Sequence, residues 1–509
     1  MANSRPLATD TSGLGQRSVV AFSWGVFASV AKVVLTILIQ AVLARLLGPE
    51  EFGLFALAIL VMGIAGYFAD SGLATSLVQQ RQVLDTDIRF VLTLNLITGA
   101  SVCLLIYCFA GYIAAGFGKP EATQIFRWLA PVFVLNALAS VSVSLLRRQL
   151  DYRSIQIANL AGYGLGFGVI GLLAAAVFGS VYALVAAYLC QAVFTLMLLY
   201  SKTRHTIGLT VHATDRSVFI GFGANVLATN LVNWAASSLD RLIVSRLFSS
   251  ATLGQYSASF NLVYSPVGAL YANLQSTIFS SMALMQGELM RMQNVYLDLL
   301  RTVTVLFLPT FLGLYFFSGP LVLMVYGSRW GEAATLAGPF CLMAPFVMIW
   351  ACSTPVLWNT GRRSMEWQLQ LPFLALAILF IVPAASTSIL AVACAAAGIY
   401  VARSILMMGL ACRALGIGLK QLLVATWPSI WIASVVGLMA KGCAVQLHAN
   451  SVSIVLQVFV GACVVVGTFA SCLLLSPTVL PVIVRRFIGS LIPFVPSAFR
   501  LLLTRLSIK

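Results

Sequence analysis

The sequence predicts an all-α integral membrane protein of about 14 transmembrane helices, with two six-helix lobes in a parallel pseudo-two-fold repeat and two further C-terminal helices. The 509 residues are 60% hydrophobic and only 9% charged, with a mean hydropathy of +0.98. A soluble protein carries about 25% charged residues, so this chain lacks the polar surface that water requires. The alternating pattern of a membrane β-barrel is absent, and helices are the remaining way to satisfy a backbone in lipid.

Hydrophobic runs long enough to cross a bilayer follow one another with short loops between them. The predicted spans are 19–47, 53–78, 88–117, 122–146, 155–178, 180–200, 218–247, 254–284, 296–326, 333–359, 365–386, 388–412, 421–445 and 452–475. The predicted domains are a cytoplasmic N-terminal tail (1–17), an N-lobe of six spans (18–200), a cytoplasmic linker (201–217), a C-lobe of six spans (218–413), two extra helices (414–475) and a basic interfacial tail (476–509).

The distribution of basic residues predicts the orientation. Counted over alternate loops, 20 Lys and Arg residues fall on one side and 5 on the other. Cytoplasmic loops of membrane proteins carry the excess of positive charge, so both termini are expected in the cytoplasm. The net charge of +16 is dispersed through these loops, and a nucleic-acid partner is therefore not expected.

Two apolar helices, one in each half, carry the same polar seam. In the first, Ser29, Lys32, Thr36 and Gln40 follow at steps of three or four, which puts them on one helix face. A shift of 201 residues superposes them on Asn230, Asn233, Ser237 and Arg241, and superposes Arg45 on Arg246. The segment from Ala44 resembles the segment from Ser245 in the same register. Substrate sites of repeat-built transporters lie between such halves, so the seams predict a shared cavity.

Charges within spans are costly, about 2.5–3.5 kcal/mol at the bilayer centre, and therefore mark candidate functional residues. The predicted substrate-binding residues are Lys32, Thr36, Gln40, Asn233, Ser237, Arg241 and Arg403. For Lys32, snorkelling of the long stem to the interface is the competing interpretation. Arg241 follows Asp240, but helix neighbours do not face each other, so pairing across the interface and binding of an anion both stay open.

Four further residues are predicted to act in coupling or gating: Asp70, Asp240, Arg45 and Arg246. A lone carboxylate within the membrane can take up a proton or bind Na⁺, and Asp70 could also cap the bend at Ser71 and Gly72. The two arginines lie at the ends of the seam helices, where interfacial anchoring explains them equally well.

Catalytic patterns are missing from the sequence. It contains no G-x-x-x-x-G-K-[ST] phosphate loop, no H-E-x-x-H and no G-x-S-x-G. We therefore expect no catalytic residues, no metal site and no cofactor, and an energy source in an ion gradient or in the substrate gradient.

The spans, the repeat and the phrase R-L-L-G-P-E-E-F-G at Arg45 to Gly53 resemble the polysaccharide exporters of the MOP flippase superfamily, in particular Wzx-type and colanic-acid-exporter-like members. The resemblance covers about residues 15–475. It implies a flippase that moves a polyprenyl-pyrophosphate-linked oligosaccharide between leaflets by alternating access, for lipopolysaccharide or exopolysaccharide synthesis. It implies lipid-linked oligosaccharide and membrane lipids as partners, together with polysaccharide polymerase and chain-length machinery.

Three alternatives stay open on sequence alone. A multidrug or cation antiporter of the same superfamily would be expected to carry several buried carboxylates, whereas basic residues predominate within these spans. A membrane glycan polymerase or ligase would be an enzyme with a large periplasmic loop, and no such loop is predicted. A lipid II flippase would have a similar site with a different glycan. The sequence does not identify the glycan, the coupling ion or the oligomeric state.

Overall fold

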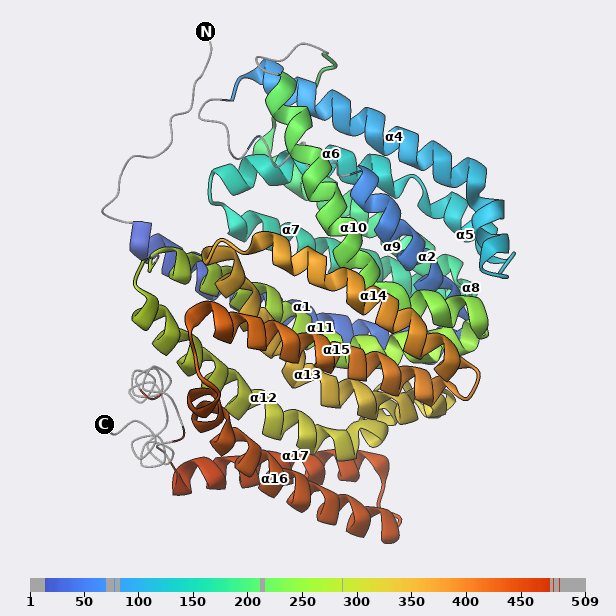
Figure 1. The fold of residues 1–509 in the computed structure, drawn as a ribbon. Helices are drawn as coiled ribbons and strands as arrows, with labels where there is room; N and C mark the ends of the chain where they lie inside the picture. Colours follow the sequence, from blue (N-terminus) through green and yellow to red (C-terminus); the bar gives the residue numbers. More distant parts are fainter. Residues whose placement is uncertain are drawn as a thin grey trace. The chain divides into compact units, whose positions relative to one another are not determined.

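A computed structural model describes residues 14–69, 77, 83–210, 216–285, 287–476, 479 and 485 of the chain, and the side chains of 14–30, 216–229 and 363–367 are not among those described. Regular secondary structure in these residues is helical throughout (Figure 1). The chain divides into two compact units, Met1–Ser257 and Ala258–Lys509, and each is described by itself.

The first unit contains a run of helices that begins at residue 14. They are α1 (Leu14–Leu47), α2 (Pro49–Ala69), α4 (Asp85–Gly116), α5 (Ala122–Leu129), α6 (Val132–Arg148), α7 (Tyr152–Tyr163), the π-helix η2 (Gly164–Gly171), α8 (Leu172–Phe178), α9 (Tyr182–Thr203), α10 (Arg216–Leu247) and the first turns of α11 (Ser250–Ala283). The second unit begins within α11.

The second unit continues with helices to residue 475. They are α12 (Leu289–Tyr326), the 3₁₀-helix η3 (Ser328–Trp330), α13 (Gly331–Asn359), α14 (Arg363–Ala385), α15 (Ile389–Leu415), α16 (Leu419–Ala449) and α17 (Ile454–Leu475). Within this unit α12 packs against α13, α16 and α17, and α13 packs against α15. Val305 and Phe317 of α12 share a hydrophobic cluster with Ile432 and Val436 of α16.

In the segment that joins α1 to α2, the first helix ends and the second begins within two residues. Gly48 has φ +83°, the left-handed conformation that ends many helices and that glycine adopts without a steric penalty. Pro49 is the first residue of α2, where its missing N–H costs nothing. Glu50 and Glu51 fall in the first turn, where the helix dipole favours negative charge.

One side of α1 is buried in the first unit. Ile39, Leu43 and Leu47 recur every four residues and are buried with Tyr163 and Phe167. The π-helix η2, which follows α7, is glycine-rich, and a Cβ at Gly166 would lie 2.6 Å from the backbone nitrogen of Gln191 on α9. The missing side chains let the two backbones approach closely, as small residues do at helix contacts in membranes.

The predicted fold class is confirmed. Eleven helical segments of the described chain are long and apolar enough to cross a membrane, which makes this a multi-pass membrane protein. The long helices α1, α10 and α11 coincide with the predicted first, seventh and eighth spans, and the total of fourteen stays a prediction. Pro131 separates α5 from α6 within the predicted fourth span, as expected for a residue that interrupts helical hydrogen bonding.

The predicted linker 201–217 separates the two repeats, whereas the compact units divide at Ser257. The reason is that α10 packs against α2, and a Cβ at Gly63 would lie 2.9 Å from Nε1 of Trp234. Lys119, in the turn after α4, also donates from Nζ to the carbonyl oxygen of Phe248 at 2.9 Å. The helix α10, which is the predicted seventh span, therefore lies in one compact unit with the six predicted spans before it. The two-lobe division of the repeats stays a prediction.

Candidate functional site

The polar face of α10 forms the centre of the candidate site. Asn233, Ser237 and Arg241 are spaced by four residues, and all three side chains are partly buried. Oδ1 of Asn233 is buried and has no hydrogen-bond partner among the described residues. Ser237 donates from Oγ to the carbonyl oxygen of Trp234 at 3.0 Å. The predicted seam is thus a continuous helical face with a buried hydrogen-bond acceptor available at Asn233.

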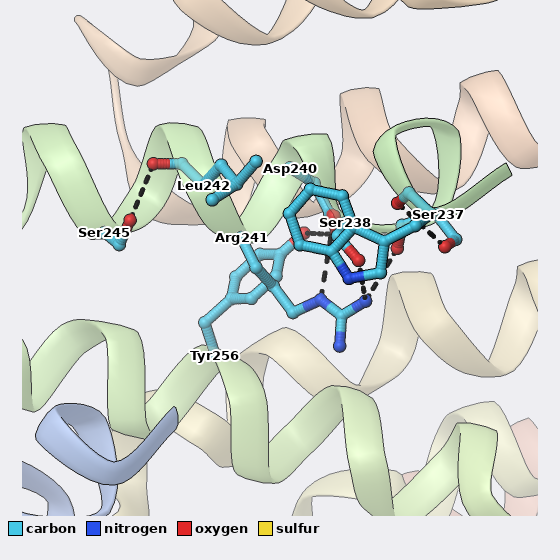
Figure 2. Close-up of polar contacts among 8 residues, drawn as sticks. Ser237, Ser238, Asp240, Arg241, Leu242, Ser245 and Tyr256 are labelled. Carbon is cyan, nitrogen blue, oxygen red and sulfur yellow. Dashed lines mark hydrogen bonds and ion pairs between the residues drawn. The ribbon is translucent and has the colours of Figure 1, made fainter. Parts of the chain in front are cut away.

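Arg241 turns back along its own helix (Figure 2). Its Nη2 donates to the carbonyl oxygen of Ser237 at 2.6 Å and lies 3.4 Å from Oγ of Ser238. Its Nε lies 3.8 Å from Oδ1 of Asp240, so these consecutive residues form an ion pair. The expectation that helix neighbours do not face each other was wrong here, because the long arginine stem lets the guanidinium fold back beside the shorter carboxylate.

Asp240 is held from the next helix as well. Its side chain is 5% exposed, against 18% for Arg241, and its Oδ2 accepts a 2.8 Å hydrogen bond from the hydroxyl of Tyr256 on α11 (Figure 2). A buried carboxylate is stable only when it is paired and hydrogen-bonded, and this one has both kinds of partner. Tyr256 was not among the residues predicted from sequence, although it is a polar side chain within an apolar span.

The residues of the first seam lie in a different environment. The side chain of Lys32 is exposed, and Thr36 lies one turn further along, beside the hydroxyl of Tyr163 on α7. Gln40 is partly buried. The helix α1 packs against α7, α8 and α2, while α10 packs against α2, so the two seam helices share α2 as a neighbour. The side chain of Ser29 lies outside the described residues.

The predicted gating residues are at the helix ends. Arg45 and Arg246 are both exposed in the last turns of α1 and α10. A Cβ at Gly118 would lie 3.6 Å from Nη1 of Arg246, so this arginine lies beside the turn that follows α4. Asp70, the predicted coupling residue, lies outside the described residues.

Arg403 is enclosed in the second unit. Its side chain is buried on α15, and its guanidinium carbon lies 3.8 Å from the ring centroid of Trp350 and 5.0 Å from that of Tyr400. Its Nη1 donates to Oε1 of Gln370 at 3.0 Å. A cation over aromatic faces is stabilised by their quadrupoles, and more so when desolvated. Neither Trp350 nor Gln370 was predicted from sequence, where the only signal was a polar residue within the apolar span of α14.

Comparisons with known proteins give a consistent result. A family model described as polysaccharide biosynthesis protein matches residues 42–335. The succinoglycan biosynthesis transport protein ExoT of Rhizobium meliloti is 25% identical over 67% of this chain and 69% of its own length. The lipopolysaccharide biosynthesis protein WzxC of Escherichia coli is 22% identical over 65% of this chain and 67% of its own length.

Solved structures share the fold. The lipid II flippase MurJ in an inward closed conformation superposes with a TM-score of 0.71 at 14% identity, covering 89% of this chain and 99% of MurJ. An inward-facing multidrug resistance MATE family transporter of the MOP superfamily gives a TM-score of 0.60 at 14% identity, covering 75% of this chain and 94% of the transporter. The resemblance inferred from sequence is confirmed: the chain belongs to the polysaccharide biosynthesis protein family and shares its fold with MurJ and with the MATE family transporter.

Proposed function

We propose that this protein is a flippase that carries a polyprenyl-pyrophosphate-linked oligosaccharide across the bacterial inner membrane, for polysaccharide biosynthesis, by alternating access. The observation that carries the proposal is the family match, which includes α2 and α10 and therefore the polar face at Arg241. The names of the relatives describe polysaccharide biosynthesis and its transport, and a flippase for another lipid-linked saccharide shares the fold.

The chemistry of the two seams fits the two ends of such a substrate. A pyrophosphate is an anion that needs charged donors once it leaves water, and arginine suits it because its planar fork presents several N–H groups. We assign this role to Arg241 and Lys32. Sugar hydroxyls both donate and accept, and we assign them to Thr36, Gln40, Asn233 and Ser237, among which Asn233 offers a buried acceptor without a partner in the described chain.

Arg403 takes a place in the proposal that depends on conformation. In this structure its guanidinium is stacked on Trp350 and bonded to Gln370. It can therefore bind substrate only in a state in which these contacts are broken. In the present state its proposed role is positional, because it joins α13, α14 and α15 through side chains from all three helices.

Coupling is proposed for the carboxylates, and gating for the arginines at the helix ends. When the substrate phosphate binds the guanidinium of Arg241, the ion pair with Asp240 is broken, and Asp240 then binds a proton or a cation. Asp70 is proposed as the second coupling residue. Arg45 and Arg246 are proposed to act at the outer ends of the seam helices, with both chain termini in the cytoplasm. Polysaccharide polymerase and chain-length machinery are the proposed protein partners, and the protein itself is a transporter and not an enzyme.

The test is export by variants that still insert into the membrane. Lys32→Ala and Arg241→Ala are each expected to reduce polysaccharide output at least tenfold, a loss of about 1.4 kcal/mol or more of binding. Lys420→Ala, an exposed residue in the first turn of α16, is the matched control and should export normally. Unchanged output from Lys32→Ala would assign that residue to the interface instead.

A deletion strain decides the class of substrate. It is expected to accumulate lipid-linked repeat units on the inner leaflet, and the wild-type gene should clear them. The multidrug antiporter is the second candidate, favoured by the MATE fold match. It predicts accumulation of ethidium instead, with no lipid-linked saccharide.

A further inference from the structure

The first turns of α2 and α11 touch each other in a reciprocal manner. A Cβ on Gly53 would overlap the carbonyl oxygen of Ser250, and a Cβ on Gly254 would overlap the carbonyl oxygen of Pro49. The same two hypothetical atoms would lie 3.0 Å from the nitrogen of Gly254 and 2.9 Å from the nitrogen of Gly53. The two backbones are therefore in direct contact, with each glycine against the first carbonyl of the other helix.

The contact has the symmetry of the sequence repeat. The shift of 201 residues that relates the seams also superposes Pro49 on Ser250 and Gly53 on Gly254, and it relates the first residues of the two helices. Gly53 contacts Ser250, and its repeat equivalent Gly254 contacts Pro49, which is the equivalent of Ser250. This reciprocal exchange of contacts is the pattern of a two-fold interface. The contact at this glycine pair therefore has the local two-fold symmetry that the sequence repeat predicts.

Small residues allow such an approach, which dispersion and Cα–H···O contacts then stabilise. Some other helical glycines of the described chain are not under this constraint. A Cβ on Gly409 of α15 or on Gly442 of α16 would meet nothing within 4 Å. The requirement for glycine at positions 53 and 254 comes from the backbone of the opposing helix.

We propose that Gly53 and Gly254 form the outer gate of the transport cycle, closed in this structure, and that α2 and α11 must separate there before substrate leaves. The proposal rests on the proposed function for what is carried, and on the predicted orientation, which puts the start of both helices at the outer surface. Alanine at either position would keep the gate from closing, whereas a cross-link between the helices would keep it from opening.

The first experiment measures gating by cysteine labelling, a readout that does not depend on export. A background with all ten cysteines replaced receives Ser237→Cys as a reporter on the polar face of α10, and intact cells are treated with a membrane-impermeant maleimide. Gly53→Ala and Gly254→Ala are each expected to raise the labelling rate about tenfold, because forced overlap in a packed contact destabilises the closed state. Gly409→Ala is the matched control and should label at the parent rate.

The two alanine variants should give no further increase when combined, since one overlap already separates the helices. Labelling equal to that of Gly409→Ala in both variants would overturn the gate. Size-exclusion profiles of the purified variants distinguish an open gate from a misfolded chain.

The second experiment keeps both glycines. Pro49→Cys and Ser250→Cys, at the first residues of the two helices, are joined by a reducible bis-maleimide. Export is expected to stop in the cross-linked protein and to return after reduction, while each single-cysteine variant is unaffected by the reagent. Full export by the cross-linked protein would overturn the gate and leave the flippase proposal intact. A third outcome separates the two proposals. If labelling of the reporter cysteine depends on the two glycines but glycan output does not depend on the protein, the flippase proposal is rejected and the gate is retained.

Discussion

The hydroxyl of Tyr256 donates a 2.8 Å hydrogen bond to the buried carboxylate of Asp240 and so joins α11 to α10. The same carboxylate pairs with Arg241 through its other oxygen. The position of the guanidinium on the seam therefore depends on a residue of the neighbouring helix. This relationship and three others lead to measurements that do not require knowledge of the glycan.

Tyr256→Phe removes the hydroxyl and leaves Oδ2 of Asp240 buried with one partner fewer. Hydrogen bonds to charged groups contribute about 1.5–3 kcal/mol, and the thermal unfolding temperature of the purified protein should fall accordingly. Tyr296→Phe is the matched control, because that tyrosine is equally buried and bonds the neutral hydroxyl of Ser353 at 2.9 Å. Equal destabilisation by the two variants would contradict a charged partner at Asp240.

Arg403→Lys keeps a positive charge but loses the planar group that stacks on Trp350. Because lysine is a compact, strongly hydrated cation, we expect a loss of about 2 kcal/mol of stability. Trp350→Leu should cost a similar amount, and the double variant should cost less than the sum, as residues in contact do. The check is a double-mutant cycle of unfolding free energies. Arg413→Lys, exposed in the last turn of the same helix, should have little effect.

Glu51→Ala should loosen the start of α9. The carboxylate of Glu51 accepts a 2.5 Å hydrogen bond from the backbone N–H of Val181, 130 residues away. Loss of a capping acceptor costs about 1 kcal/mol, so amide exchange at Val181 should accelerate about fivefold. The neighbouring substitution Glu50→Ala removes an exposed carboxylate of the same turn and serves as control. Unchanged protection of Val181 in Glu51→Ala would show that another group holds this turn.

Acid should release the start of the linker. Burial lowers the pKa of His205 below its ordinary value, while the carbonyl of Thr206 acts in the opposite direction. The imidazole ring of His205 packs edge-on against the ring of Tyr200, with 5.3 Å between the two ring centroids. Because the neutral form is the one that fits, its contribution is present above the unfolded pKa of about 6.5 and is lost as the pH falls through the lowered folded value.

Limited proteolysis of residues 201–210 tests this pH dependence. Cleavage should be slow at about pH 7.5 and faster at about pH 5.5, on either side of the unfolded value for histidine. His205→Phe retains an aromatic ring and removes the titrating group, so its cleavage should depend little on pH. The same pH dependence in His205→Phe would show that another group is responsible.

The fold was predictable because its signals are local. Long apolar runs, Gly48 before Pro49, and the spacing of Asn233, Ser237 and Arg241 are all properties of short segments. The partners of these side chains were not predictable, since they come from other helices. Tyr256 reaches Asp240 across a helix pair, and Trp350 and Gln370 reach Arg403 from two different helices. Sequence periodicity defines the face of a helix and leaves open which helix that face meets.

The tie between Lys119 and Phe248 has a consequence for biosynthesis. The lysine emerges from the ribosome well before the carbonyl oxygen that accepts its hydrogen bond, and Glu51 likewise precedes Val181. The first compact unit ends at Ser257, so the first six spans leave both α10 and the partner of Lys119 still to be made. During translation these early helices must therefore stay in the membrane with unfilled packing positions until the seventh arrives. A truncated chain that stops in the linker is expected to be recognised by quality-control proteases, and one that extends past Ser257 is expected to escape them.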